Sequence, residues 1–184
     1  MTERPIIFSA PMVKALLAGR KSQTRRLATS PLAKTKVGDM LWVRECFTTL
    51  PAEMQAQPGG GYLHIPQSTL YGVDFVGFDK PERDWNWSSS IHMPRWASRL
   101  TLAVAKVRLE RLHEMTAHSA GTFNAQAEGI DVAPLSPEAA VRAFADLWNS
   151  LHAKPGTTWD DNPDVVAITF CVRQGNIDEQ EAAE

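Results

Sequence analysis

The sequence predicts an α+β fold with a strand-dominated core and three or four helices. Residues 100–109 give the strongest strand signal, because successive side chains there alternate between two faces of an extended segment. Residues 136–152 instead repeat apolar side chains at helical spacing behind Ser136 and Pro137, a favoured helix start. At 184 residues the chain suits one domain that buries about 70% of its unfolded surface.

Shorter patterns predict the remaining elements. Short apolar or β-branched runs indicate strands at residues 6–8, 40–45 and 165–171. A helix with Pro11 in its first turn follows the first of these strands and ends before Gly19. Thr116 is the expected N-cap of a further helix, which runs to Ala127 and is terminated by Gly129.

The chain divides into one domain, an insertion and a tail. We expect a single domain over residues 1–173. Proline and glycine interrupt residues 48–90, which predicts an irregular insertion over one face of the core, with short strands at 62–65 and 69–76. Residues 174–184 hold four acids and no base, a composition typical of a disordered tail. Without those four acids, 17 acids face 19 bases, so the domain itself is mildly basic.

The composition also excludes several classes of protein. No apolar run approaches the length that spans a membrane, and residues 1–5 precede too few apolar residues for a signal peptide, so we expect a cytoplasmic protein. Cys46 and Cys171 lie far apart in apolar contexts, which favours buried thiols in a reducing compartment over a disulfide. No cysteine and histidine spacing resembles a zinc site, and we expect neither a metal nor a cofactor.

Reactive and charged groups are concentrated directly after the first predicted helix, in the run Arg20-Lys21-Ser22-Gln23-Thr24-Arg25-Arg26. The neighbouring arginines disfavour the protonated form of Lys21 and so lower its pKa. A hydroxyl such as that of Thr24 needs a base to act as a nucleophile, so this pair suits acyl transfer. Residues 20–36 hold six bases and no acid, so phosphate binding and a solvated basic turn remain alternatives.

Two further positions carry charge where the local pattern disfavours it. Glu128 falls at the C-terminal end of a predicted helix, where the helix dipole opposes a carboxylate. This is either a solvated helix end or a sign that a nearby group needs a carboxylate. Arg44 and Glu45 end the strand predicted at residues 40–45, where they mark either its exposed end or a polar pair that faces a pocket.

The order of these motifs resembles the ASCH domain family. The similarity rests on the short first strand, the helix end and basic run at residues 18–26, and the Val37-Gly38-Asp39 turn before a strand. The longer, phage-associated branch of the family resembles this chain at residues 42–45, 90–99 and 166–170. In outline the resemblance covers residues 5–173. It implies a PUA-like mixed β-barrel flanked by helices.

The resemblance also implies a reaction and the residues that perform it. A smaller branch of the family comprises N4-acetylcytidine amidohydrolases, which use a lysine, a threonine and a glutamate. By motif these roles carry over to Lys21, Thr24 and Glu128. The implied activity is removal of the acyl group from N4-acetylcytidine or related N4-acylated cytosine nucleosides. The residues expected to bind the substrate are Arg26, Arg44, Glu45, Met93 and Trp96.

Two mechanisms use the same three residues. In the first, Thr24 attacks the acyl carbon, Lys21 takes the hydroxyl proton, and Glu128 positions the amine or relays the proton to the departing nitrogen. In the second, Glu128 activates water and Lys21 stabilises the oxyanion. Trapping an acyl-Thr24 intermediate would support the first mechanism.

The competing interpretation is an RNA-binding, or RNA-cleaving, module, because PUA-like domains commonly bind RNA. In that case basic side chains contact phosphates and a tryptophan stacks on a base. The basic candidates are Arg26, Lys34, Lys36 and Arg44, and the aromatic candidates are Trp85, Trp87 and Trp96. The modest charge of the domain favours a nucleoside or a short RNA segment over long duplex contacts.

Overall fold

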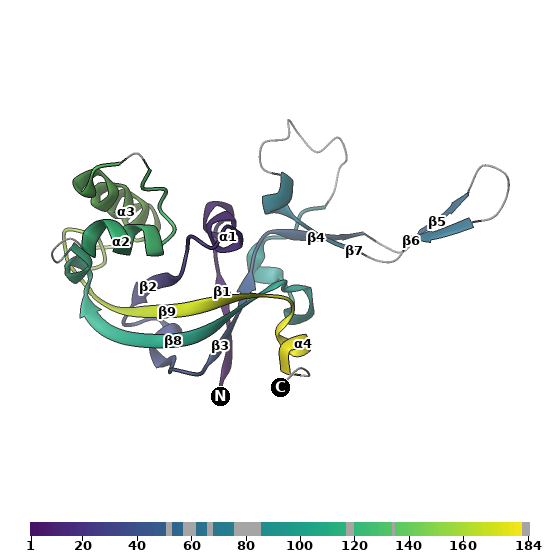
Figure 1. Cartoon of the computed structure of the whole chain (residues 1–184), viewed down its shortest axis with the longest axis horizontal. Coiled ribbons are helices and arrows are strands. Elements are labelled where there is room, and N and C mark those ends of the chain that lie inside the picture. The colour runs from purple at the N-terminus through teal and green to yellow at the C-terminus, as the bar shows by residue number, and fades with distance from the viewer. Residues whose placement is uncertain are drawn as a thin grey trace.

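The computed structural model describes residues 1–50, 53–56, 62–65, 68–75, 86–116, 120–133 and 135–181. The described chain is α+β: a five-stranded sheet curls into a half-barrel, and helices cover it (Figure 1). The sheet has the order β1-β3-β8-β9-β2. Its strands are β1 (Glu3–Ile7), β2 (Gln23–Leu27), β3 (Met40–Arg44), β8 (Leu100–Arg111) and β9 (Asp164–Gln174). The predicted fold class is therefore confirmed at the level of a curled mixed sheet with flanking helices.

The paired strands β8 and β9 are the longest in the sheet. β1 pairs in parallel with β3, and the other neighbours pair antiparallel. Val104 pairs with Phe170 but Lys106 pairs with Thr169, so Ala105 is the extra residue of a β-bulge. A bulge bends its strand and increases the local twist, which helps to curl the sheet.

Three predicted helices are present and end close to the predicted positions, but the second begins later than predicted, at Ala120. They are α1 (Ala10–Leu17), α2 (Ala120–Ala127) and α3 (Pro137–Leu151). The Ser136 hydroxyl accepts a hydrogen bond from the Ala139 N–H at 3.2 Å, so α3 has the predicted N-cap. Gly19 and Gly129 follow α1 and α2 in the left-handed region, at φ 68° and 93°. Glycine adopts this conformation without strain, which ends both helices as predicted.

Two apolar clusters hold the helices to the sheet. In the first, Leu16 of α1 packs with sheet residues such as Ile6 and Leu102, each at most 1% exposed. In the second, Ala125 of α2 and Phe144 of α3 pack together beyond the end of the sheet. The two clusters position the ends of α1 and α2 near β2.

The insertion is more regular than predicted. β4 (Phe47–Leu50) pairs with β7 (Ser68–Tyr71), and β5 (Glu53–Ala56) pairs with β6 (Tyr62–Ile65), both antiparallel. β6 lies where the sequence predicts it, whereas the strand expected at residues 69–76 is replaced by β7 and the 3₁₀ helix η2 (Gly72–Phe75). In Figure 1 the two-stranded ribbons extend away from the five-stranded sheet. Short backbone pairing thus replaces the expected irregular loop in the described part of the insertion.

The remaining short elements are 3₁₀ helices at η1 (Pro31–Lys34), η3 (Ser90–His92), η4 (Arg95–Ala97) and η5 (Leu112–Thr116). Thr116 is not the N-cap of α2, because it ends η5, where its hydroxyl donates to the His113 carbonyl at 2.7 Å. Cys46 and Cys171 are free, as predicted, but both are exposed. Cys171 alternates out of the core along β9, and Cys46 lies just after the end of β3, so neither thiol is buried as expected.

The first part of the predicted disordered tail is folded against the domain. After β9 ends at Gln174, the short helix α4 (Ile177–Glu181) follows. Ile177 is 1% exposed, and Asp178 forms an ion pair with Arg95 at 2.6 Å. The Asn176 side chain also donates to three backbone carbonyls of residues 95–98. These contacts offset the conformational entropy that residues 175–181 lose when they become ordered. The acidic composition of the segment gives no sign of such contacts.

Candidate active site

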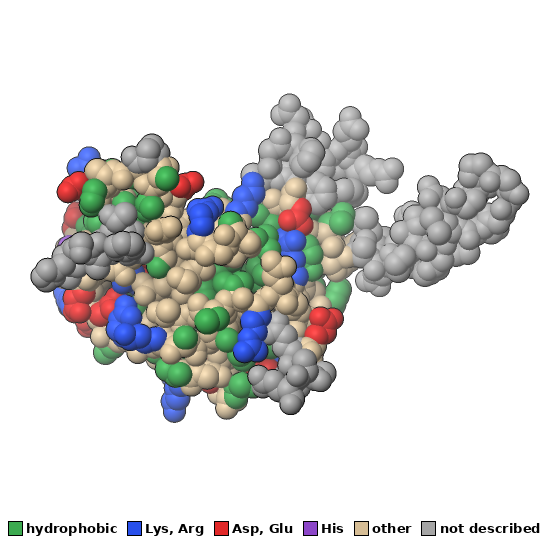
Figure 2. All heavy atoms as spheres, viewed as in Figure 1, with side chains coloured by type: hydrophobic (Ala, Val, Ile, Leu, Met, Phe, Trp, Pro, Cys, Tyr) green, Lys and Arg blue, Asp and Glu red, His purple; other side chains and the backbone are tan. Residues whose placement is uncertain are grey.

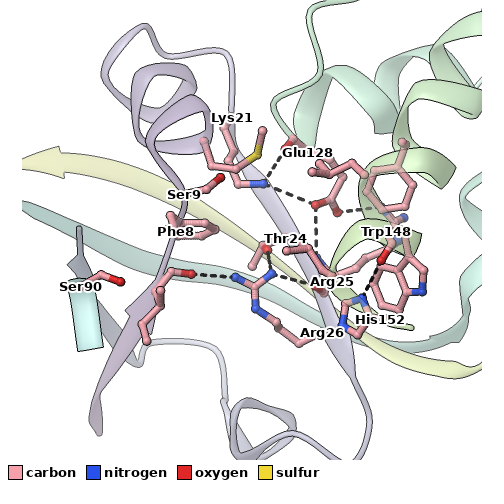
Figure 3. Close-up of a pocket in the computed structure, with 15 residues that line it drawn as sticks. Phe8, Ser9, Lys21, Thr24, Arg25, Arg26, Ser90, Glu128, Trp148 and His152 are labelled. Carbon is pink, nitrogen blue, oxygen red and sulfur yellow. Dashed lines mark hydrogen bonds and ion pairs between the residues drawn. The ribbon is translucent and has the colours of Figure 1, made fainter. Parts of the chain in front are cut away.

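A cavity of about 470 Å³ opens between β2 and the end of β1, the two edge strands of the sheet (Figure 3). Its walls come from the end of β1, α1, β2, the end of α2 and the last turns of α3. The Arg26 guanidinium on β2 donates to the Ile7 carbonyl on β1 at 3.1 Å. One side chain therefore bridges the two edge strands beside the cavity.

Lys21 reaches the cavity from the connection between α1 and β2. The Ala15 carbonyl accepts from the N–H groups of Arg20 and Lys21, at 2.9 and 3.1 Å, which fixes the turn after α1. The Lys21 side chain is 2% exposed. Its Nζ donates to the Glu128 carbonyl at 2.6 Å and to the Gln23 carbonyl at 2.9 Å, and lies 3.4 Å from the Glu128 carboxylate. The amine is thus held by three acceptors in a site with little water.

Burial changes the protonation of Lys21. Loss of water contact lowers the pKa of the Lys21 amine from 10.5 to about 8, and the positive charges of Arg26 and Arg25 act in the same direction. The Glu128 carboxylate opposes this change because it favours the protonated amine. Desolvation outweighs the carboxylate, so at pH 7 about one amine in ten is neutral. A group with this pKa can both accept and return a proton near neutral pH.

Glu128 is placed by the end of α2. Gly129 follows it at φ 93°, and a Cβ atom there would lie 3.1 Å from the Ala15 Cβ and 3.2 Å from the Lys21 Cδ. Only glycine fits this close approach without displacing Lys21. The Glu128 carboxylate accepts from the Arg25 guanidinium at 2.9 Å and from the Arg25 backbone N–H at 3.3 Å. These cationic partners compensate a carboxylate that the helix dipole disfavours at this end.

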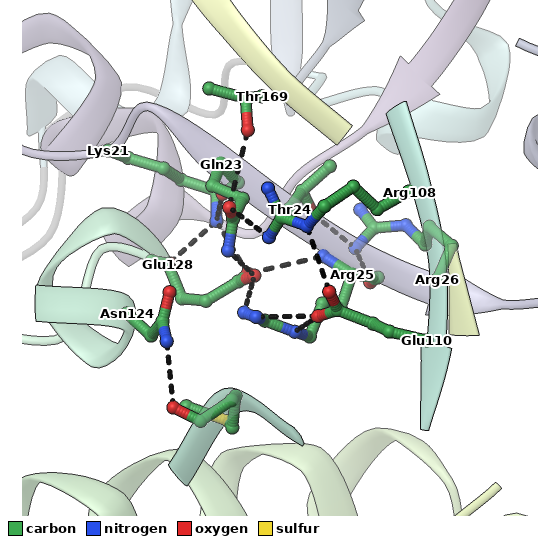
Figure 4. A network of polar contacts seen from close by, with 11 residues as sticks. Lys21, Gln23, Thr24, Arg25, Arg26, Arg108, Glu110, Asn124, Glu128 and Thr169 are labelled. Atoms are coloured by element: carbon green, nitrogen blue, oxygen red, sulfur yellow. Dashed lines mark hydrogen bonds and ion pairs between the residues drawn. The ribbon is translucent and has the colours of Figure 1, made fainter. Parts of the chain in front are cut away.

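Glu128 belongs to a network of ion pairs that extends through Arg25 to Glu110 on β8 (Figure 4). The Arg25 side chain is 1% exposed and also binds Glu110 of β8 at 2.8 Å. Arg108, two residues before on the same strand, binds the other oxygen of Glu110 at 3.0 Å. A buried arginine of this kind requires carboxylate partners because its charge is always present. β2 is consequently a buried, ion-paired strand, and the solvated basic turn considered from the sequence is wrong.

Thr24 lies on the cavity side of β2. It is fully buried, and its hydroxyl oxygen accepts from the Arg26 guanidinium at 2.7 Å. The guanidinium lies 5.2 Å from the centre of the Phe8 ring, and burial lowers the pKa of Arg26. A cation bound to a hydroxyl oxygen stabilises the alkoxide over the alcohol. Thr24 therefore lies in surroundings that favour loss of its proton.

Aromatic side chains line the cavity on two sides, with Phe8 beside Lys21 and Trp148 across from it (Figure 3). Phe8 lies at the end of β1, and Lys21 Nζ is 5.3 Å from the centre of its ring. Phe144 and Trp148 face the cavity from α3, and each is 3% exposed. The Trp148 indole N–H donates to the Thr157 carbonyl at 2.8 Å, which fixes the ring. The cavity thus joins a polar, cationic end to a flat apolar wall, the combination that organic ligands with both characters require.

The structure brings together four of the sequence-predicted site residues. Lys21, Thr24, Arg26 and Glu128 all line the cavity. The other four do not: they lie along the end of β3 and around η4, and they are Arg44, Glu45, Met93 and Trp96.

Each of these four side chains has other surroundings. Arg44 donates to the Ile91 carbonyl and lies over the Trp42 ring. Glu45 binds Arg99 at 3.0 Å, and burial raises the pKa of its carboxyl. Met93 is 1% exposed in a separate apolar cluster, whereas Trp96 is 57% exposed. Trp85, a candidate for RNA stacking, lies outside the described residues.

Sequence reasoning did not identify three contributors to the site. Glu110 is a strand residue that resembles an exposed acid, and no local pattern pairs it with Arg25. Phe144 and Trp148 belong to a helical stripe that the sequence assigns only to the core. That stripe did contain a signal, because His152 follows at the same four-residue spacing and therefore shares its face. A titratable ring that extends an aromatic stripe is a candidate for a pocket residue.

Charged side chains are mixed in sign on the face of the molecule in Figure 2. Lysines and arginines there alternate with acids and hydrophobic side chains and do not form one basic area. An extended basic surface is the usual requirement for binding a nucleic-acid backbone. The face shown offers no such surface.

Two classes of feature are absent from the part of the chain that the structure describes. No three histidine, cysteine, aspartate or glutamate side chains gather there in a way that could hold a metal ion. No described helix has the length and apolar character needed to cross a membrane.

Comparisons with known proteins do not assign the chain to a family. No family model matches the sequence, and no curated protein matches it. The crystal structure of the hypothetical protein PH0355 is 12% identical, covers 94% of this chain and 100% of its own, and has a TM-score of 0.45. That of protein EF3133 from Enterococcus faecalis, described with the family DUF984, is 11% identical, covers 96% and 83%, and also has a TM-score of 0.45.

Proposed function

We propose that this protein is an amide hydrolase that removes the acyl group from N4-acetylcytidine or related N4-acylated cytosine nucleosides. The observation that carries the proposal is the buried Lys21 amine, with a pKa of about 8, which contacts Glu128 and shares a cavity with Thr24. The same proposal includes membership of the ASCH family and a PUA-like barrel, and the curled sheet supports it. The shared position of Lys21, Thr24 and Glu128 in the cavity lining supports the choice of these three residues.

The first chemical step uses Thr24 as the nucleophile. Neutral Lys21 takes the hydroxyl proton as the Thr24 oxygen bonds to the acyl carbon, and the carbonyl π electrons move to its oxygen. Arg26 already contacts the Thr24 oxygen at 2.7 Å and is near enough to that centre to stabilise negative charge as it develops. The tetrahedral intermediate then expels the N4 nitrogen, which takes the proton from the Lys21 ammonium. The products of this half-reaction are the free amine of cytidine and acyl-Thr24.

Water completes the reaction by the reverse sequence. Neutral Lys21 takes a proton from water as the hydroxide oxygen bonds to the acyl carbon, and the ammonium returns that proton to the departing Thr24 oxygen. The carboxylic acid leaves and the enzyme is regenerated.

Glu128 has a positioning role in this scheme. Both oxygens of its carboxylate already accept hydrogen bonds, from Arg25 on one side and from Arg25 and Lys21 on the other. This favours a carboxylate that orients the amine over one that activates water. In the alternative mechanism Glu128 is the base and Lys21 remains an ammonium that binds the oxyanion.

The cavity suits a nucleoside in size and character. Its volume of about 470 Å³ lies within the range of about 300–1,000 Å³ that is typical of small-molecule sites. A flat base can lie against Phe8 or Trp148, because aromatic rings pack well on one another at short distance. The acylated nitrogen would then face the polar end that holds Lys21.

The deciding experiment follows the ultraviolet absorbance of N4-acetylcytidine with purified protein. We expect conversion to cytidine and a loss of about 10²–10⁴ in rate for Lys21→Ala, the range expected when a general base is removed. Lys36→Ala is the matched control, because Lys36 is an exposed lysine outside the cavity. Undiminished turnover by Thr24→Ala would exclude an acyl-Thr24 intermediate but would leave the hydrolase function supported.

A different result would change the assigned function. If the folded wild-type protein converts no N4-acetylcytidine even at high protein concentration, the proposed hydrolase function is contradicted. Salt-dependent binding of short RNA, weakened by Lys36→Ala, would then support the RNA-binding alternative.

A further inference from the structure

His152 is the cavity residue with the least explained role. It follows α3 at the C-cap, and its ring is half-buried in the cavity wall. The ring stacks on Trp148, with centroids 4.0 Å apart and planes at 20°. Neither the fold nor the proposed reaction requires an imidazole at this position, because a phenyl ring would stack equally well on the indole.

The hydrogen bond of His152 fixes its tautomer. Nδ1 lies 3.0 Å from the Trp148 carbonyl oxygen. A carbonyl oxygen can only accept, so Nδ1 carries the proton. Burial and the positive charge of Arg26 lower the pKa of the ring, which keeps it neutral near pH 7. Nε2 is consequently a hydrogen-bond acceptor with an available lone pair, and no described residue donates to it.

The other charged groups of the cavity have the opposite capacity. Arg25 and Arg26 can only donate, the Lys21 amine is directed at Glu128 and Gln23, and both oxygens of Glu128 are already bound by Arg25 and Lys21. In Figure 3 His152 and the Lys21–Glu128 pair occupy different ends of the lining, with Thr24 and Arg26 between them. The cavity therefore offers an acceptor set apart from the amide-cleaving residues.

We propose that His152 Nε2 binds a sugar hydroxyl of the nucleoside while the acylated base lies against the apolar wall. This inference rests on the proposed function and deepens it. In the nucleoside, where N1 carries the sugar, the acylated base has a single N–H donor, at the nitrogen that must face Lys21, whereas the sugar carries several hydroxyl donors. His152 thus makes the protein selective for a nucleoside over an N1-methylated acylated base, which has no other N–H donor.

A second histidine provides a matched control. His113 stacks on Trp159 with centroids 4.6 Å apart, and its Nε2 lies 2.8 Å from the Trp159 carbonyl oxygen. It repeats the arrangement of a histidine on the ring and carbonyl of a tryptophan, but it does not line the cavity. His113→Phe therefore measures the effect on KM and kcat of replacing a stacked histidine by phenylalanine at a site outside the cavity.

The experiment compares N4-acetylcytidine with N4-acetyl-1-methylcytosine, a base that lacks both the sugar and an N1–H donor, as substrates of His152→Phe, His152→Gln and His113→Phe. His152→Phe keeps an aromatic ring on Trp148 but removes the acceptor. We expect it to raise KM for the nucleoside about fivefold to tenfold, the effect of one lost hydrogen bond, with kcat within about twofold and no change for the methylated base. His152→Gln restores an acceptor and recovers most of the loss. His113→Phe leaves both substrates unchanged.

Three results would overturn the inference: equal KM values of the wild-type protein for nucleoside and base, equal changes for both substrates in His152→Phe, or no change for either. Should the wild-type protein convert neither compound, tryptophan fluorescence gives the dissociation constants of the same two compounds. Tighter binding of the nucleoside that depends on His152 then supports this inference even though the hydrolase fails. Absence of that difference overturns it.

Discussion

Two groups of paired charges differ in the sign of their excess charge. The cavity cluster consists of Lys21, Arg25, Arg26, Arg108, Glu110 and Glu128. The Arg99 cluster consists of Arg99 with Glu45 and Asp74, which it binds at 3.0 and 2.8 Å. Cations outnumber anions in the first cluster, and anions outnumber cations in the second.

Burial is the main cause of the unusual titration in each cluster, and the excess charge acts in the same direction. In the cavity cluster, burial lowers the pKa of Lys21 and the excess arginines reinforce the change. In the Arg99 cluster, burial raises the pKa of Glu45 and the Asp74 charge reinforces the change, against the effect of Arg99. Lys21 lines the cavity between β1 and β2, whereas Glu45 is not part of that lining. The comparison shows that a perturbed pKa indicates a candidate active site when the perturbed group also has space for a substrate.

The largest expected effect is a difference in stability between the two clusters. Arg25→Met leaves two buried carboxylates short of a partner, and we expect it to lower the free energy of unfolding by about 3–5 kcal/mol. Arg99→Met should cost only about 1 kcal/mol, because Arg99 is 24% exposed and Glu45 can take up a proton. Urea unfolding at pH 7 measures both values. Equal losses would remove the distinction between the clusters.

The next effect is the pH dependence of the reaction. If neutral Lys21 is the base, kcat/KM rises about tenfold per pH unit below pH 8 and becomes level above it, because only the deprotonated amine is active. If the ammonium binds an oxyanion instead, the rate falls above pH 8. The residual rate of Lys21→Ala should show neither change. A profile of kcat/KM from pH 6 to 10 decides between these mechanisms.

Local sequence signals account for the helices and for part of the site. Ser136 and Pro137 predict the start of α3, Gly19 predicts the end of α1, and both are confirmed because caps depend on a few adjacent residues. The basic run itself predicts that Lys21 and Thr24 act as a pair, and the family resemblance adds Glu128 to them. The structure places all three on one cavity, although their roles stay a prediction.

The parts that could not be predicted depend on contacts between distant residues. β2 does not resemble a strand because it contains Arg25 and Arg26, and its burial is acceptable only with Glu110 and Glu128, about a hundred residues away. The apolar spacing of α3 predicts a buried face, and Phe144 and Trp148 are buried on it. The outer edge of this face also forms a wall of the cavity, because the half-barrel is open between the edge strands β1 and β2. No local sequence pattern encodes that opening.

The smallest expected effect tests the residues around the Arg99 cluster as substrate contacts. Trp96 is 57% exposed and lies outside the cavity lining, so Trp96→Ala should change the KM for N4-acetylcytidine by less than about twofold. The same variant should weaken RNA binding if the exposed indole stacks on a base, by about 1–3 kcal/mol for one stacking contact. Steady-state kinetics and RNA titration on one preparation give both numbers. A large change in KM would mean that the substrate extends beyond the cavity to η4, and the separation between the two clusters would then no longer mark the limit of the site.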